Sequence, residues 1–133
     1  MRLPLGLLAI GAILAALLVP GPRGTPAAAH AGVITMGHEE FGRSEVTIRT
    51  GQRLTFSNPS HWLHVLVPGK GARQSSQTGS PRLGSRNAHL SQRGDRFVTG
   101  AWNVPGTYFI TCQLHPEMTL EVRVLPRLSH PNA

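Results

Sequence analysis

The stretch GTYFITCQLHPEM, residues 106–118, decides the fold that we expect, because it contains the only cysteine of the 133-residue chain at the end of an apolar run. Tyr108, Ile110 and Cys112 are alternate residues, so in an extended strand their side chains point to the same side. A strand that buries the first two side chains therefore also points the thiol inward, at the end of a hydrophobic core.

The same stretch supplies two further metal-binding side chains. His115 and Met118 follow Cys112 at spacings of three residues, so a short turn can fold them back over the sulfur. A thiolate, an imidazole and a thioether form a soft ligand set that suits copper and lacks only a second imidazole. Zinc fits this set less well, since zinc sites usually draw on more cysteine or carboxylate. We interpret the stretch as a metal-binding loop.

The pattern Gly-Thr-Tyr-x3-Cys-x2-His-Pro-x-Met resembles the carboxy-terminal copper loop of the blue copper proteins, the cupredoxins, and is most similar to that of plastocyanin- and amicyanin-like members. The resemblance covers roughly residues 36–125, and only its two copper-binding segments are specific. It implies an all-β fold for residues 32–125, a Greek-key β-sandwich of the cupredoxin type. It also implies one mononuclear type 1 copper site that cycles between Cu(I) and Cu(II).

The resemblance places the first histidine ligand upstream, after a strand that ends in Asn. His64 lies six residues after Asn58 and opens the apolar run Val65–Val67, as the ligand of the family does. His61 is the rival, because it is also an imidazole that could bind copper.

The resemblance also implies a role for each ligand. Cys112 would be the strong ligand, with His64 and His115 completing a trigonal plane. Met118 would be the weak axial ligand that tunes the reduction potential. Four protein ligands leave no open position and no substrate pocket, so we expect a one-electron carrier and not an enzyme. The alternative is an exported copper chaperone or storage protein without a redox partner.

Two positions depart from the family pattern. Plastocyanin-like chains often have Gly two residues after the Met, where this chain has Leu120, and Asn after the first His, where it has Val65. Asn58 therefore remains as the residue that we expect to steady the Cys112 loop by hydrogen bonding.

The amino terminus predicts export. A short basic start, an apolar run and small residues in an A-x-A pattern are the parts of a signal peptide, here residues 1–31. Cleavage after Ala29 or after Ala31 fits the pattern, and an uncleaved anchor is the alternative. The protein would then be periplasmic or extracellular. Cleavage after Ala29 would leave His30 first, where its amine and ring could form a separate copper site.

The charge of the chain bears on its partners. The formal net charge is +7, and removal of the two signal-peptide arginines leaves +5, which favours docking to an acidic redox partner. Export and the lack of a basic stripe with interleaved aromatic residues exclude nucleic acid as a partner. We expect a monomer whose partner docks near His115, Leu114 and Pro116, with Trp62 close by.

The rest of the chain has the pattern of short strands. We expect strands at residues 33–36, 45–49, 53–57, 65–67, 96–99, 108–112 and 120–124. Residues 69–95 form a polar insert, in which we expect a short strand or helical turn near Ala88–Leu90. We interpret His89 and the run His38–Glu40 as solvated, and residues 126–133 as a flexible tail.

Overall fold

The computed structural model describes residues 30–83 and 88–128. Its strands, in chain order, are β1 (His30–Thr35), β2 (Glu45–Arg49), β3 (Arg53–Ser57), β4 (His64–Lys70), β5 (Arg73–Gln74), β6 (His89–Leu90), β7 (Arg96–Val98), β8 (Gly106–Cys112) and β9 (His115–Leu125). The described residues contain no α-helix, so the prediction of an all-β chain is confirmed. They also contain no helix that is long and apolar enough to cross a membrane.

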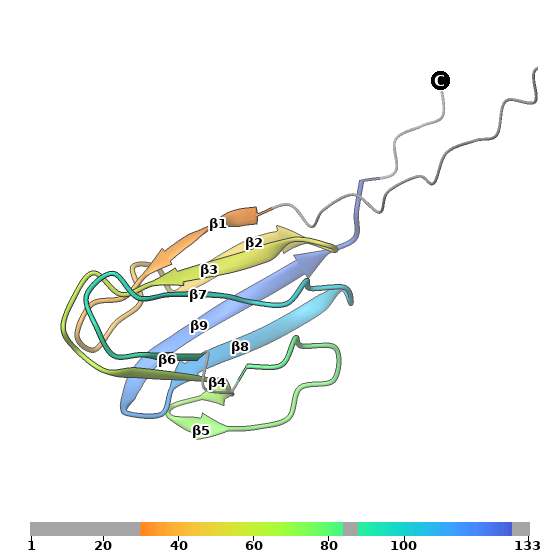
Figure 1. The fold of residues 1–133 in the computed structure, drawn as a ribbon. Coiled ribbons are helices and arrows are strands. Elements are labelled where there is room, and N and C mark those ends of the chain that lie inside the picture. The colour runs from red at the N-terminus through yellow and green to blue at the C-terminus, as the bar shows by residue number, and fades with distance from the viewer. Residues whose placement is uncertain (1–29, 84–87, 129–133) are drawn as a thin grey trace, which may run out of the picture.

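The strands form two sheets that face each other as the layers of a sandwich (Figure 1). One sheet has the strand order β1-β3-β7, and the other has the order β2-β9-β8-β4-β5, with β6 paired to β4. From β1 to β4 each successive strand changes sheet, and the chain crosses again between β6 and β7 and between β7 and β8. These crossings are those of a Greek-key sandwich, in which loops gather at the two ends of the sheets.

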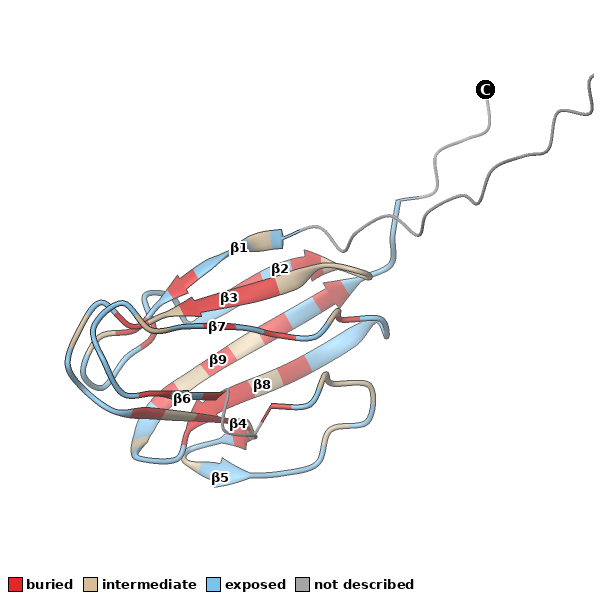
Figure 2. Cartoon of the chain, viewed as in Figure 1, coloured by how far each residue is buried: buried red, intermediate tan, exposed pale blue. Residues whose placement is uncertain are grey.

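The core lies between the sheets because their strands alternate in polarity. Tyr108, Ile110 and Cys112 in β8 are buried, as predicted from their alternate positions. In β9, Leu120, Val122 and Val124 are buried, while the residues between them are at least partly exposed. Figure 2 shows that buried residues occur along the strands of both sheets.

Strands β1, β4, β8 and β9 are longer than the sequence indicated. β4 continues through Pro68 and Gly69 to Lys70, whereas we expected it to end at Val67. Gly69 has a φ of 141°, and a side chain there would collide with the carbonyl oxygen of Arg73 in the paired strand β5. Glycine therefore allows the tight β4–β5 hairpin at this point.

The expected metal-binding loop is the end of a hairpin. Only Gln113 and Leu114 separate β8 from β9, so His115 and Met118 lie in β9. The ladder is regular as far as Thr111, which pairs with Thr119, and then shifts so that Cys112 pairs with His115. This shift leaves residues 116–118 without partners in the ladder and brings His115 beside Cys112.

The insert also contains regular structure. β5 and the short strand β6 lie within residues 69–95, and β6 confirms the expectation for residues 88–90. Gln77 forms two hydrogen bonds of 2.7 Å with the backbone of Phe109, accepting from its N–H and donating to its carbonyl oxygen. Its side chain thereby occupies part of the edge of β8 that β4 does not cover. Most of the predicted signal peptide, and residues 129–133 of the predicted tail, fall outside the described residues.

Candidate metal centre

Three potential metal ligands meet at one end of the sandwich. Cys112 is the last residue of β8, His115 is the first of β9, and His64 is the first of β4. Their ligand atoms all lie within 4.8 Å of one another. Cys112 and His64 are fully buried, whereas His115 is half-buried at the surface.

The sheet explains why residues so far apart in the sequence meet. β4 and β8 are antiparallel neighbours, and Leu66 pairs with Cys112. The start of β4 therefore lies beside the end of β8. The Gln113–Leu114 turn then brings His115 back to the same place, since Cys112 and His115 are partners in the β8–β9 ladder.

The distances fit one metal ion. Nδ1 of His64 lies 3.9 Å from Sγ of Cys112, and Nδ1 of His115 lies 3.5 Å from the same sulfur. Metal bonds of about 2.0–2.3 Å at about 120° to one another would place neighbouring donor atoms about 3.7 Å apart. One thiolate and two imidazoles in this arrangement form the trigonal set of one sulfur and two nitrogen donors that suits copper.

Backbone groups fix the position of the sulfur. The N–H of Val65 donates to Sγ of Cys112 at 3.4 Å, and the N–H of Gln113 donates to the carbonyl oxygen of Val65 at 2.9 Å. The departure from the family pattern at Val65 therefore leaves this backbone hydrogen bond to the sulfur in place. Both hydrogen bonds are made by the backbone, so the sulfur is held by the pairing of β4 with β8.

His64 is prepared to bind as a neutral ring. Burial, and then the nearby rings of His115 and His38, lower the pKa of His64, while the backbone of Gly37 acts in the opposite direction. Nε2 of His64 is buried and has no hydrogen-bond partner. A neutral imidazole with Nδ1 turned toward the thiol is ready to accept a metal without first losing a proton.

Met118 is buried in β9, three residues after His115. The hydroxyl of Thr111 donates to the carbonyl oxygen of Met118 at 2.7 Å, which holds the backbone of β9 across the register shift. Met118 is 1% exposed and belongs to the hydrophobic core. Its burial is compatible with the predicted axial role, which stays a prediction.

The other histidines of the described residues do not join this group. His61, the rival of His64, is exposed and lies in the loop before β4. His89 is exposed in β6, as expected. Within residues 30–83 and 88–128, the only group of three or more possible His, Cys or carboxylate ligands is that of His64, Cys112 and His115.

Asn58 supports the site differently from our prediction. Its side-chain amide donates to the carbonyl oxygens of Trp62 at 2.7 Å and Leu90 at 3.2 Å, and its Oδ1 accepts from the backbone and side chain of Ser60. These hydrogen bonds hold the segment that leads into His64. We predicted that Asn58 would steady the Cys112 loop, which is instead tied to Val65.

Sequence reasoning missed His38. The ring of His38 is stacked on that of Trp62, with centroids 3.7 Å apart, and it meets the ring of His115 edge-on at 5.4 Å. We had interpreted His38 as solvated, and its side chain is 47% exposed. No local pattern indicates this contact, because two separate loops and the start of β9 form it.

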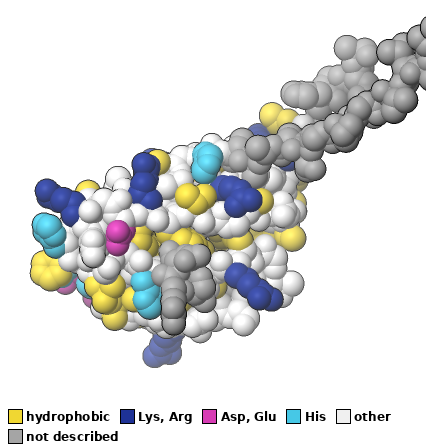
Figure 3. Space-filling view, in the orientation of Figure 1, with side chains coloured by type: hydrophobic (Ala, Val, Ile, Leu, Met, Phe, Trp, Pro, Cys, Tyr) yellow, Lys and Arg dark blue, Asp and Glu magenta, His cyan; other side chains and the backbone are white. Residues whose placement is uncertain are grey.

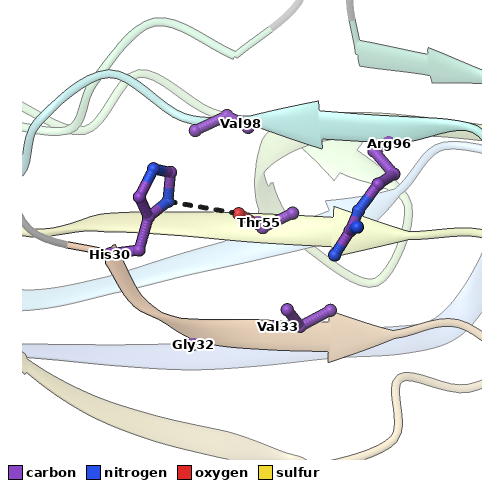
Figure 4. A pocket seen from close by; sticks show the side chains of 6 residues that line it. All are labelled: His30, Gly32, Val33, Thr55, Arg96 and Val98. Carbon is purple, nitrogen blue, oxygen red and sulfur yellow. Dashed lines mark hydrogen bonds between the residues drawn. The ribbon is translucent and has the colours of Figure 1, made fainter.

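A shallow pocket lies elsewhere, on the three-stranded sheet (Figure 4). His30, Val33 and Arg96 contribute to its lining, and Nδ1 of His30 lies 3.4 Å from Oγ1 of Thr55. Apart from His30, the lining contains no His, Cys or carboxylate, and the guanidinium of Arg96 disfavours a cation. The side chains here therefore add little to a copper site at His30.

Comparisons with known proteins identify the fold. No protein-family model and no curated protein matches the sequence. Among solved structures, amicyanin from Paracoccus versutus superposes with a TM-score of 0.55 at 22% identity, over 77% of this chain and 86% of amicyanin. A reduced amicyanin mutant gives 0.53 at 17% identity, over 70% and 80%. The Cu-containing nitrite reductase from Thermus scotoductus SA-01 gives 0.57 at 22% identity, over 72% of this chain and 22% of the reductase. The chain therefore has the cupredoxin fold.

Proposed function

We propose that this chain of cupredoxin fold is an exported type 1 copper protein that carries single electrons between redox partners. The observation that carries the proposal is the cluster of Nδ1 of His64, Nδ1 of His115 and Sγ of Cys112, whose spacing and chemistry suit one copper ion. The solved amicyanins, which share the fold, include reduced, oxidised and Cu(I) forms.

Each residue would have a defined part in this function. Cys112 would hold copper most strongly, His64 and His115 would complete the plane, and Met118 would bind weakly along the axis. Bound copper would supply a centre that gains or loses one electron. The strands and the Val65 amide would hold the ligands in the same positions in both oxidation states, which keeps reorganisation small.

The site is suited to electron transfer and not to catalysis at the metal. Three ligands and a buried methionine would surround the ion with protein groups and leave no position for substrate. His115 is the ligand nearest solvent, and Leu114 and Pro116 on either side of it are exposed. We propose that a partner docks here through a small, transient interface.

Export follows from the amino-terminal sequence, as an interpretation of residues 1–31. A free thiol outside the cytoplasm is protected from oxidation when it binds a metal. The burial of Cys112 and its place beside two imidazoles support this role.

A copper chaperone or storage protein could use the same ligands, so the deciding experiment measures electron exchange. The Cu(II) protein is titrated with a mild reductant, and its redox couple is recorded by cyclic voltammetry. The rate of electron self-exchange between Cu(I) and Cu(II) molecules is measured by NMR line broadening. A reversible one-electron couple with fast self-exchange is expected for a carrier. Copper that is released on reduction would instead indicate transport or storage.

A further inference from the structure

An aromatic stack connects His115 to the surface. His38 lies in the loop between β1 and β2, and Trp62 lies in the loop between β3 and β4. Their rings are nearly parallel, with an angle of 19° and a centroid distance of 3.7 Å, and the ring of His38 meets that of His115 at 74°. Trp62 is 51% exposed, so one end of the stack is open to solvent.

The backbones of both loops are held in place. The carbonyl oxygen of Trp62 accepts from Asn58, and the N–H of Trp62 donates to the hydroxyl of Ser60 at 3.2 Å. In the other loop, the N–H of Gly37 donates to the carbonyl oxygen of Glu40 at 2.8 Å. A large aromatic ring that is fixed and half-exposed is the kind of residue that anchors protein contacts.

Exposed apolar groups continue around Trp62. Its neighbour Leu63 is 44% exposed, and Leu114, which precedes His115, is 49% exposed. Figure 3 shows hydrophobic and His side chains together at the left end of the molecule, the end where Figure 1 places the loop between β3 and β4. Exposed apolar side chains around the ligand His115 suit a docking interface from which water is excluded.

The charge near the stack differs from that of the whole chain. The sequence has only six acidic residues, and three of them, Glu39, Glu40 and Glu117, are exposed within two residues of His38 or His115. One positive charge also lies near this region. Arg93 donates to the carbonyl oxygen of Pro59, in the loop that contains Trp62. The face is therefore locally acidic on a basic chain, and a positively charged partner surface complements it.

We infer that Trp62 and His38 are the contact through which an electron passes between His115 and a redox protein whose surface is apolar at its centre and basic at its rim. This inference rests on the proposed electron-carrier function. With copper held by His64, Cys112 and His115, one electron would leave the reduced partner and reduce Cu(II) to Cu(I), or pass in the reverse direction. Trp62 and His38 keep their bonds and protons and provide the packed path between the two centres.

The kinetic test uses tris(1,10-phenanthroline)cobalt(III), a cationic aromatic oxidant, and ferricyanide, an anionic one. Both are reacted with the Cu(I) protein. We expect Trp62→Ala and His38→Ala to slow the cobalt reaction roughly two- to tenfold, the scale of one lost aromatic contact. Trp62→Phe and His38→Phe keep an aromatic ring and should react nearly as fast as the original chain.

Three controls separate this role from a structural one. The absorption spectrum and the potential should be the same in all four variants. The ferricyanide reaction should change less than the cobalt reaction, because its charge does not suit this face. Val104→Ala removes an exposed apolar side chain from the segment before β8, away from Cys112, and should leave both rates unchanged.

A binding test needs no copper. In the metal-free protein, tris(1,10-phenanthroline)ruthenium(II) should shift the NMR amide signals of residues 37–40, 61–63, 114, 115 and 117, and Trp62→Ala should remove these shifts. Unchanged cobalt kinetics in Trp62→Ala, or shifts confined to another face, would overturn the inference. A chain that forms no reversible copper couple would instead overturn the proposed function, and the ruthenium test would still report on the face.

Discussion

The amide of Val65 donates a hydrogen bond to the sulfur of Cys112 at 3.4 Å, across the antiparallel pair of β4 and β8. This hydrogen bond joins the strand that begins with His64 to the strand that ends with the thiol. The pairing of β4 with β8 thus fixes the position of the sulfur relative to His64.

Cys112→Ser should abolish the colour of the Cu(II) protein and keep the fold. A short copper–thiolate bond gives strong visible absorption, and a serine oxygen does not provide it. The substitution exchanges one small buried group for another and should cost about 1–3 kcal/mol of unfolding free energy. Visible absorption and circular dichroism check the two outcomes. A faint copper spectrum in the original chain would contradict a type 1 site.

His64→Gly and His61→Gly form a matched pair. Nδ1 of His64 lies near the thiol, so its removal should open a coordination position and bleach the blue colour, which added imidazole can restore. His61 is exposed and should be replaceable with little spectral change. Bleaching by His61→Gly alone would show that the upstream ligand is three residues earlier.

The metal-free protein should lose stability in acid through His64. Its pKa is lowered from 6.5 by burial and by the neighbouring imidazoles, so below that pH the unfolded chain binds a proton that the folded chain does not. The free energy of unfolding is therefore not reduced by His64 above pH 6.5. It falls as the pH drops from 6.5 to the lowered pKa of the folded state. Urea unfolding at a series of pH values should show this slope. His64→Leu should flatten it, whereas His61→Leu should leave it unchanged.

Asn58→Ala should destabilise the segment that leads into His64. The buried amide satisfies the carbonyl oxygens of Trp62 and Leu90 and accepts from Ser60, so its loss should cost about 1–3 kcal/mol. Urea unfolding of the metal-free protein measures this cost. Asn103→Ala, at an exposed position, provides the control and should cost much less. Equal effects of the two substitutions would mean that the Asn58 network contributes little.

Export is checked by mass spectrometry of the protein from its natural host. The mature chain should begin at Gly32 or His30, because both A-x-A sites are well formed. It should also be recovered outside the cytoplasm. Recovery of an intact chain with Met1 from the cytosol would contradict the prediction.

Much of the fold was predictable because alternation of polar and apolar residues marks half-buried strands. The bounds of β2 and β3 agree with that pattern, and so does the burial of Cys112. The extension of β4 through Pro68 was not predictable, since proline and glycine usually end a strand. Here a hairpin requires the glycine, and only the pairing with β5 reveals this.

The candidate site was predictable only in part, for a related reason. Cys112 and His115 are close in sequence, and His64 could be reached from the family pattern. The contact of His38 with His115 depends on how separate loops fold over the same end of the sandwich, and no sequence period reports it. The direction of the Asn58 hydrogen bonds likewise depends on the turn at Ser60.

The two hydrogen bonds between Gln77 and Phe109 have a consequence for the behaviour of the protein at high concentration. An uncovered strand edge offers paired N–H and carbonyl groups to which another chain can add a strand, which is how aggregation and fibrils begin. The Gln77 amide occupies both groups of Phe109, where β4 has left β8. A single side chain of the polar insert thus removes the N–H and carbonyl of Phe109 as a pairing site for a strand of another chain.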